Sequence, residues 1–81
     1  TFNLSISPNP FKDHFKFYST TNSNDLVTIK VYDTLGKMID FLVTEDNVIS
    51  KLELGNNYPS GIYKIIVIQG ENLVTKNIIK L

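Results

Sequence analysis

Apolar and polar residues alternate with a period of two along most of this chain, and turn-forming residues separate the alternating runs. The run from Leu26 to Asp33 is the clearest, because Val27, Ile29 and Val31 share one side of an extended chain and polar residues take the other. No stripe with the helical period is present. The pattern predicts an all-β protein whose strands each bury one face.

About seven short strands are expected from these runs, over residues 3–6, 14–20, 26–33, 37–44, 48–54, 61–69 and 73–81. The turns between them recur at the spacing of an immunoglobulin-like antiparallel β-sandwich. The stretch 61–69 is apolar on both faces, which indicates a central or covered strand. The faces of 37–44 are less distinct, so we expect a β-bulge there.

Composition and charge limit the number of domains and the possible partners. With 81 residues, 42% of them hydrophobic, the chain suits one small domain over residues 1–81. Cysteine is absent, which excludes a disulfide scaffold. Lys and Arg total 8 and Asp and Glu total 8, so we expect no nucleic-acid partner. No apolar run approaches the roughly 20 residues that span a bilayer, so we expect no direct membrane insertion.

Residue types that perform chemistry are scarce and poorly placed. His14 is the only histidine, and its neighbour Asp13 would point to the opposite face of a strand, which argues against a catalytic set. The acidic turns Glu45–Asp46 and Asn24–Asp25 could offer oxygen ligands to calcium, but side-chain capping of turns explains them more simply. We therefore predict no enzymatic activity, no cofactor and no metal.

By exclusion, the residues favour a recognition or structural module. One alternative is a fibronectin-like or carbohydrate-binding accessory module of a secreted hydrolase, since that class shares the sandwich fold. A sugar-binding module is expected to carry a planar row of aromatic residues. The four tyrosines here are scattered over different strands and loops, and tryptophan is absent.

Four stretches carry a more specific signal: ISPNPF (6–11), VYDTLGKMI (31–39), LGNNYPSGIYKIIV (54–67) and TKNIIKL (75–81). In this order and spacing they resemble the type A C-terminal sorting domain of the type IX (Por) secretion system of Bacteroidota. The resemblance covers nearly the whole chain. Tyr58 stands where that family often has leucine, and Asn77 separates Lys76 from Ile78.

The resemblance implies that the chain is a removable address label and a C-terminal fragment of a larger secreted cargo protein. The cargo would cross the inner membrane by its own signal peptide and pass through the periplasm. A type IX outer-membrane shuttle and translocon would then recognise the domain, and a sortase would remove it. The cargo would be secreted or attached to the outer-membrane surface.

Ten residues of the matching motifs are the candidate recognition residues: Pro8, Asn9, Pro10, Gly36, Gly61, Tyr63, Lys76, Ile78, Lys80 and Leu81. Structural roles are also open for some of them, because Gly61 suits a turn, Tyr63 suits packing between sheets, and residues 8–10 suit a rigid connector. Lys76 could equally be a charge that keeps an edge strand soluble. As a mechanism, we expect residues 74–81 to form an exposed strand that a receptor strand extends.

Overall fold

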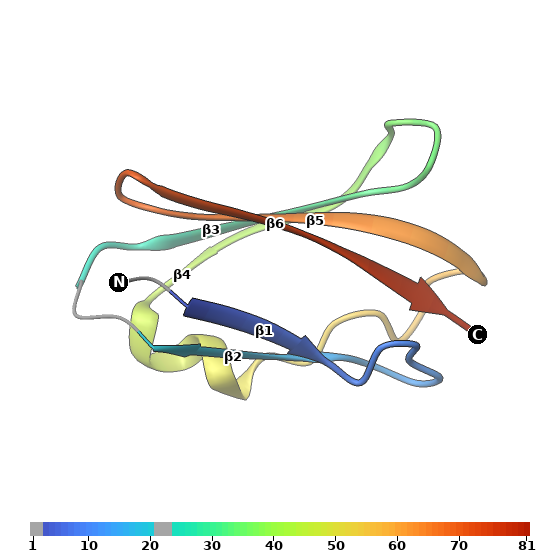
Figure 1. The fold of residues 1–81 in the computed structure, drawn as a ribbon, viewed down its shortest axis with the longest axis horizontal. Coiled ribbons are helices and arrows are strands. Elements are labelled where there is room, and N and C mark those ends of the chain that lie inside the picture. Colours follow the sequence, from blue (N-terminus) through green and yellow to red (C-terminus); the bar gives the residue numbers. More distant parts are fainter. Residues whose placement is uncertain (1–2, 21–23) are drawn as a thin grey trace.

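Two antiparallel sheets build the described part of this computed structural model, which comprises residues 3–20 and 24–81 (Figure 1). The six strands of these residues are β1 (Asn3–Ser7), β2 (Lys16–Thr20), β3 (Val27–Tyr32), β4 (Met38–Thr44), β5 (Gly61–Gln69) and β6 (Asn72–Lys80). Strands β1 and β2 form the small sheet, and the large sheet has the order β4-β3-β5-β6. The predicted all-β, immunoglobulin-like sandwich is confirmed.

The large sheet follows the alternation in the sequence. Val27, Ile29 and Val31 of β3 are all buried, as predicted. Strand β5 pairs with β3 on one side and with β6 on the other, so the expected central strand is confirmed. The pairing of β3 with β4 shifts between Val31 and Tyr32, which confirms the expected bulge.

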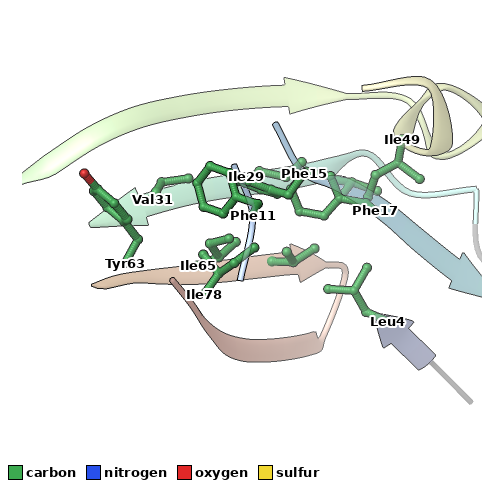
Figure 2. Packing of buried hydrophobic residues seen from close by; sticks show 12 residues of the cluster. Leu4, Phe11, Phe15, Phe17, Ile29, Val31, Ile49, Tyr63, Ile65 and Ile78 are labelled. Atoms are coloured by element: carbon green, nitrogen blue, oxygen red, sulfur yellow. The ribbon is translucent and has the colours of Figure 1, made fainter. Parts of the chain in front are cut away.

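The core lies between the two sheets and combines aromatic rings from one side with aliphatic side chains from the other (Figure 2). The rings of Phe11 and Phe15 meet edge to face with centroids 4.9 Å apart, and those of Phe15 and Phe17 are 5.6 Å apart. Ile29, Ile65 and Ile78 of the large sheet are fully buried in the same cluster. Burial of each such side chain contributes about 1.5–3 kcal/mol, so these contacts dominate the stability of a small domain.

The expected strand over residues 48–54 is wrong. Most of that segment belongs to the 3₁₀ helix η1 (Asp46–Lys51), and only Leu54 pairs in a strand-like way, with Phe15. Strand alternation would put Leu52 and Leu54 on the inner face, yet Ile49 is the residue that is buried. The helix lies beside β2 in Figure 1, where one local turn places Ile49 against the core without requiring a strand partner.

A hairpin turn over residues 33–37 connects β3 to β4, as predicted. The Asp33 Oδ1 atom accepts hydrogen bonds from the backbone N–H groups of Leu35 and Lys37, at 3.0 and 2.9 Å. Gly36 has φ +84°, a left-handed conformation that other residues rarely adopt. Elsewhere in the described ranges, no helix has the length and apolar content needed to cross a membrane.

Candidate recognition site

Three of the four sequence motifs meet at one end of the large sheet, where the chain after β1 lies along β6 (Figure 1). On one side of β6, Gly61 pairs with Lys80 and Tyr63 pairs with Ile78. On its other side, Phe11 forms a parallel bridge with Lys80. Residues that are far apart in the sequence therefore form one continuous region, which we call the clasp end.

The Asn9 side chain takes the place of a neighbouring strand beside β6. Its Nδ2 atom donates to the backbone oxygen of Asn77 at 3.1 Å, and its Oδ1 atom accepts from the backbone N–H of Ile79 at 3.0 Å. A strand backbone offers the same combination of one donor and one acceptor. Asparagine carries both groups on one planar amide, whereas aspartate at neutral pH could only accept.

Phe11 continues this pairing with its backbone. Its N–H donates to the oxygen of Ile79 at 2.8 Å, and its carbonyl accepts from the N–H of Leu81 at 2.9 Å. The phenyl ring is fully buried in the core. Pro8 and Pro10 on either side of Asn9 follow cis peptide bonds and lie exposed. Since proline has no backbone N–H, the Asn9 amide is the main polar group that this segment presents to β6.

These four hydrogen bonds correct the expectation that residues 74–81 form an unpaired edge. Alternate residues of a strand direct their backbone groups to the same side, and Asn77, Ile79 and Leu81 direct theirs toward the Asn9–Phe11 segment. Residues 77–81 are therefore already paired. Leu73 and Thr75 have the same orientation, and within the described residues no backbone group pairs with them on that side.

Gly55 permits the close packing behind the clasp end, and sequence reasoning missed this role. A Cβ atom at this position would lie 2.6 Å from Cε2 of Phe11 and 3.0 Å from Cδ2 of Phe15. Its φ of +99° also disfavours any side chain. The only signal in the sequence was a second glycine ahead of the Gly61–Tyr63 motif.

Two tyrosines border the core at this end of the molecule. The Tyr58 hydroxyl donates to Oδ2 of Asp40 at 3.0 Å, and the Tyr63 hydroxyl donates to the backbone oxygen of Pro59. Their ring centroids are 5.0 Å apart. Burial raises the pKa of Tyr58, and the hydrogen bond to Asp40 and its charge raise this pKa further. Burial also raises the pKa of Tyr63, with a smaller effect from the charge of Asp33.

The structure separates the predicted recognition residues by accessibility. Tyr63 and Ile78 are buried and belong to the core. At the clasp end, Lys80 places its Nζ atom 5.9 Å from the centre of the Phe11 ring, within the range of a cation–π contact. Two predicted residues lie apart from the clasp end: Gly36 in the β3–β4 turn, and Lys76, which is exposed along β6 opposite Ile65.

The remaining polar residues form ordinary local contacts. His14 lies 3.7 Å from Glu53, with both side chains substantially exposed. Gln69 is buried, and its Nε2 atom donates to the backbone oxygen of Asp25 and to Oδ1 of Asp46, which links the two acidic turns. Among residues 3–20 and 24–81, no group of three or more His, Cys, Asp or Glu side chains is arranged to hold a metal ion.

The fold and this site define a small β-sandwich whose opening segment is hydrogen-bonded to its last strand. Comparison with protein-family models matches residues 5–81 to the secretion system C-terminal sorting domain, and the chain belongs to this family. It is therefore a C-terminal sorting signal of the type IX secretion system, as the motifs predicted. A comparison with curated proteins finds no match.

Family membership also decides between the two functions considered from the sequence. A sorting signal acts with the secretion machinery on a parent cargo chain, and its cargo is secreted or displayed at the cell surface. The alternative of a carbohydrate-binding or fibronectin-like accessory module is not favoured. This family is not known for enzymatic activity.

Proposed function

We propose that the type IX machinery recognises this domain at the clasp end. The observation that carries the proposal is the pair of hydrogen bonds from the Asn9 amide to Asn77 and Ile79. These bonds hold the exposed prolines beside the exposed end of β6, so that two distant motifs form one surface. The outer-membrane shuttle and translocon would bind this surface while the cargo is in the periplasm.

The candidate residues then have two kinds of role. The groups that contact the receptor at the clasp end are the exposed Pro8, Asn9, Pro10 and Leu81 and the half-buried Lys80, and the exposed Lys76 contacts it farther along β6. Gly61, Tyr63 and Ile78 hold this surface in place, and Gly36 shapes the separate β3–β4 turn. A receptor strand would add to the open part of the β6 edge at Leu73 and Thr75, because residues 77–81 are already paired.

We also propose that the domain serves only as a signal. A sortase removes it after translocation, and the cargo is then released or attached to the outer surface. Two observations support a signal without catalysis of its own. The family is one of sorting domains. The single histidine forms a 3.7 Å ion pair with an exposed glutamate.

An export assay tests the recognition proposal. The 81-residue chain is fused behind a periplasmic signal peptide and a fluorescent reporter, in a host with an intact type IX system and in a translocon-deficient sibling. We expect surface or medium signal only in the intact host. We expect Asn9→Asp to reduce this signal about tenfold, because a carboxylate would face the Asn77 carbonyl. Asn56→Asp, in an exposed loop, is the matched control.

A second variant separates recognition from stability. Ile65→Val removes one methylene from the core and is expected to cost about 0.5–1.5 kcal/mol while leaving the clasp end intact. Normal export of Ile65→Val together with loss of export for Asn9→Asp supports the proposal. Equal loss for both variants would mean that export follows stability alone, and the recognition surface would have to be sought elsewhere.

A further inference from the structure

The large sheet has a second apolar face, on the side away from the core, which the sorting motifs do not explain. We call this the outer face. Strand registers place its residues in rows across the sheet: Val43–Thr28–Ile68–Leu73, Phe41–Lys30–Ile66–Thr75, Met38–Tyr32–Lys64–Asn77, and Ile62–Ile79. In Figure 1 the small sheet lies below the large sheet, and of the described segments only the β3–β4 turn rises above it, at one end.

Large apolar side chains gather on this outer face. Phe41, Ile62 and Leu73 are 54%, 52% and 61% exposed. Of the large hydrophobic residues exposed in the described ranges, six belong to the outer face: Met38, Phe41, Val43, Ile62, Leu73 and Ile79. A sheet that packs one face on a core normally turns polar residues to water on the other. Exposed apolar side chains that gather on one face in this way point to an interaction site.

The outer face is also hollowed next to the β3–β4 turn. A shallow cavity of about 410 Å³ lies there, lined by side chains that include Tyr32, Ile62, Lys64 and Ile66. Asp33 lies at its rim, but Oδ1 of that carboxylate already accepts two backbone hydrogen bonds of the turn. The cavity can therefore receive a protruding side chain, with the Lys64 ammonium available beside it.

Charge on the outer face indicates the chemistry of what covers it. The only charged side chains at its strand positions are Lys30 and Lys64, and the strand positions carry no carboxylate. The whole chain nevertheless has a formal net charge of +0, so its acidic residues other than Asp33 at the cavity rim lie elsewhere. Complementarity requires an apolar partner that brings carboxylates to these two lysines.

The position of the lysines argues against two other occupants. A second copy of this chain, docked through the same face, would offer the lysines only lysines or neutral groups. A face that enters a lipid bilayer carries its lysines at the rim, where they reach the headgroups. Lys30 and Lys64 instead lie on β3 and β5, the two central strands of the sheet.

We propose that the outer face docks a protein of the type IX machinery, through an apolar surface that carries carboxylates opposite Lys30 and Lys64. This docking is a second contact, separate from the clasp end, and it rests on the proposed function. The edge of β6 at Leu73 and Thr75 adjoins the outer face. One partner could therefore cover the apolar rows and pair with the open edge at the same time.

The export assay tests this contact with two variants of the outer face. Lys30→Glu/Lys64→Glu reverses both charges, and we expect export to fall about tenfold. Phe41→Thr/Ile62→Thr removes exposed apolar area while keeping β-branched residues on the strands, and we expect a fall of about threefold or more. The matched controls are Lys16→Glu/Lys51→Glu and Tyr18→Thr, away from this face, which should stay within about twofold.

The outcomes separate this inference from the proposed function. If both outer-face variants are exported as well as the parent chain while Asn9→Asp is not exported, the docking proposal for the outer face is overturned. The proposal for the clasp end is then retained. If the reporter fused to the unmodified domain is exported equally by the intact and the translocon-deficient host, the proposed function itself is overturned. Thermal unfolding accompanies each variant. If the charge reversal prevents folding, Lys30→Gln/Lys64→Gln decides the question in its place, with reduced export expected.

Two measurements on the purified domain test the other occupants. We expect no flotation with vesicles of anionic phospholipid and phosphatidylcholine, and a monomer in sedimentation equilibrium. Vesicle binding that Lys30→Glu/Lys64→Glu abolishes would assign the face to lipid and overturn the proposal. A dimer that Phe41→Thr/Ile62→Thr dissociates would assign it to a second copy and overturn it as well.

Discussion

The two faces of β5 have similar apolar residues and opposite surroundings. On the inner face, the side chains of Tyr63, Ile65 and Val67 are buried in the core, on the side that faces the small sheet. On the outer face of the same strand, Ile62 is exposed and Ile66 is only half-buried. The inner face is covered because Phe11 and its neighbouring phenylalanines reach it from the small sheet and the loops. The described chain supplies no corresponding cover for the outer face.

From this difference we infer that apolar residues in one strand serve folding on one side and binding on the other. Hydrophobic composition alone does not separate the two roles. The neighbouring residues across the sheet distinguish the two roles. The outer rows include Lys30 and Lys64, whereas the inner rows of β3 and β5 contain only apolar residues and Gln69. Changes on the inner face should therefore affect stability, and changes on the outer face should affect export.

The largest expected effect comes from placing the same charge on the two faces at adjacent positions. Ile65→Lys buries an unpaired ammonium in the core, and we expect a loss of more than about 4 kcal/mol, enough to unfold a small domain. Ile66→Lys puts the charge on the outer face, and we expect a loss below about 1 kcal/mol. Urea unfolding followed by circular dichroism measures both. Similar losses for the two variants would show that the outer face is structural.

Gly55→Ala should have the next largest effect. The added methyl group would overlap Phe11 at 2.6 Å in a backbone with φ +99°, so we expect a loss of about 2–4 kcal/mol. Gly36→Ala is the matched control, because its φ is +84° and no atom lies within 4 Å of the new methyl. It should cost only the backbone strain, about 1–2 kcal/mol. Equal unfolding midpoints for the two variants would mean that the Phe11 ring can move aside.

A substitution of Asn9 tests how the edge of β6, between the two faces of the sheet, is covered. Asn9→Ala leaves the Ile79 N–H and the Asn77 carbonyl without their side-chain partner, at an exposed site where water can replace it. We expect a loss of about 0.5–1.5 kcal/mol. Hydrogen exchange should accelerate at the amide of Ile79 and remain slow at Ile65 in the sheet centre. Unchanged protection at Ile79 would contradict a role of Asn9 in covering this edge.

Much of the fold could be predicted from the sequence because each strand that packs on one side follows strict alternation. The alternation alone predicted both the strand and the buried face of Val27, Ile29 and Val31. The segment around Ile49 could not be assigned in this way, because a short helix and a short strand of mixed residues look alike over so few positions.

The candidate recognition site was only partly predictable. The sequence motifs identified Asn9 and Lys80, but not that the Asn9 side chain would pair with the backbone of β6, since a contact between residues this far apart leaves no local pattern. The same limit applies to Gly55, whose close approach to Phe11 depends on the path of another segment. The outer face also required the sheet order, because Phe41 and Ile62 become neighbours only through β3 and β5.

An effect as small as that of Asn9→Ala is expected from the tyrosines at the margin of the inner face. Burial raises the pKa of Tyr58 and Tyr63 above the usual value of 10.0, so both hydroxyl groups stay neutral longer in the folded state than in the unfolded chain. Their contribution to stability is complete below about pH 10 and is lost as the pH rises through the folded-state values.

Tyr58→Phe removes one of these groups together with its hydrogen bond to Asp40. We expect a loss of about 0.5–1.5 kcal/mol at neutral pH and a shallower decline of the free energy of unfolding above about pH 10. Tyr18→Phe, on the exposed side of β2, is the control and should reproduce the decline of the parent chain. Urea titrations at a series of pH values measure the slope. An unchanged slope in Tyr58→Phe would assign the alkaline sensitivity to other groups and leave the outer-face predictions unaffected.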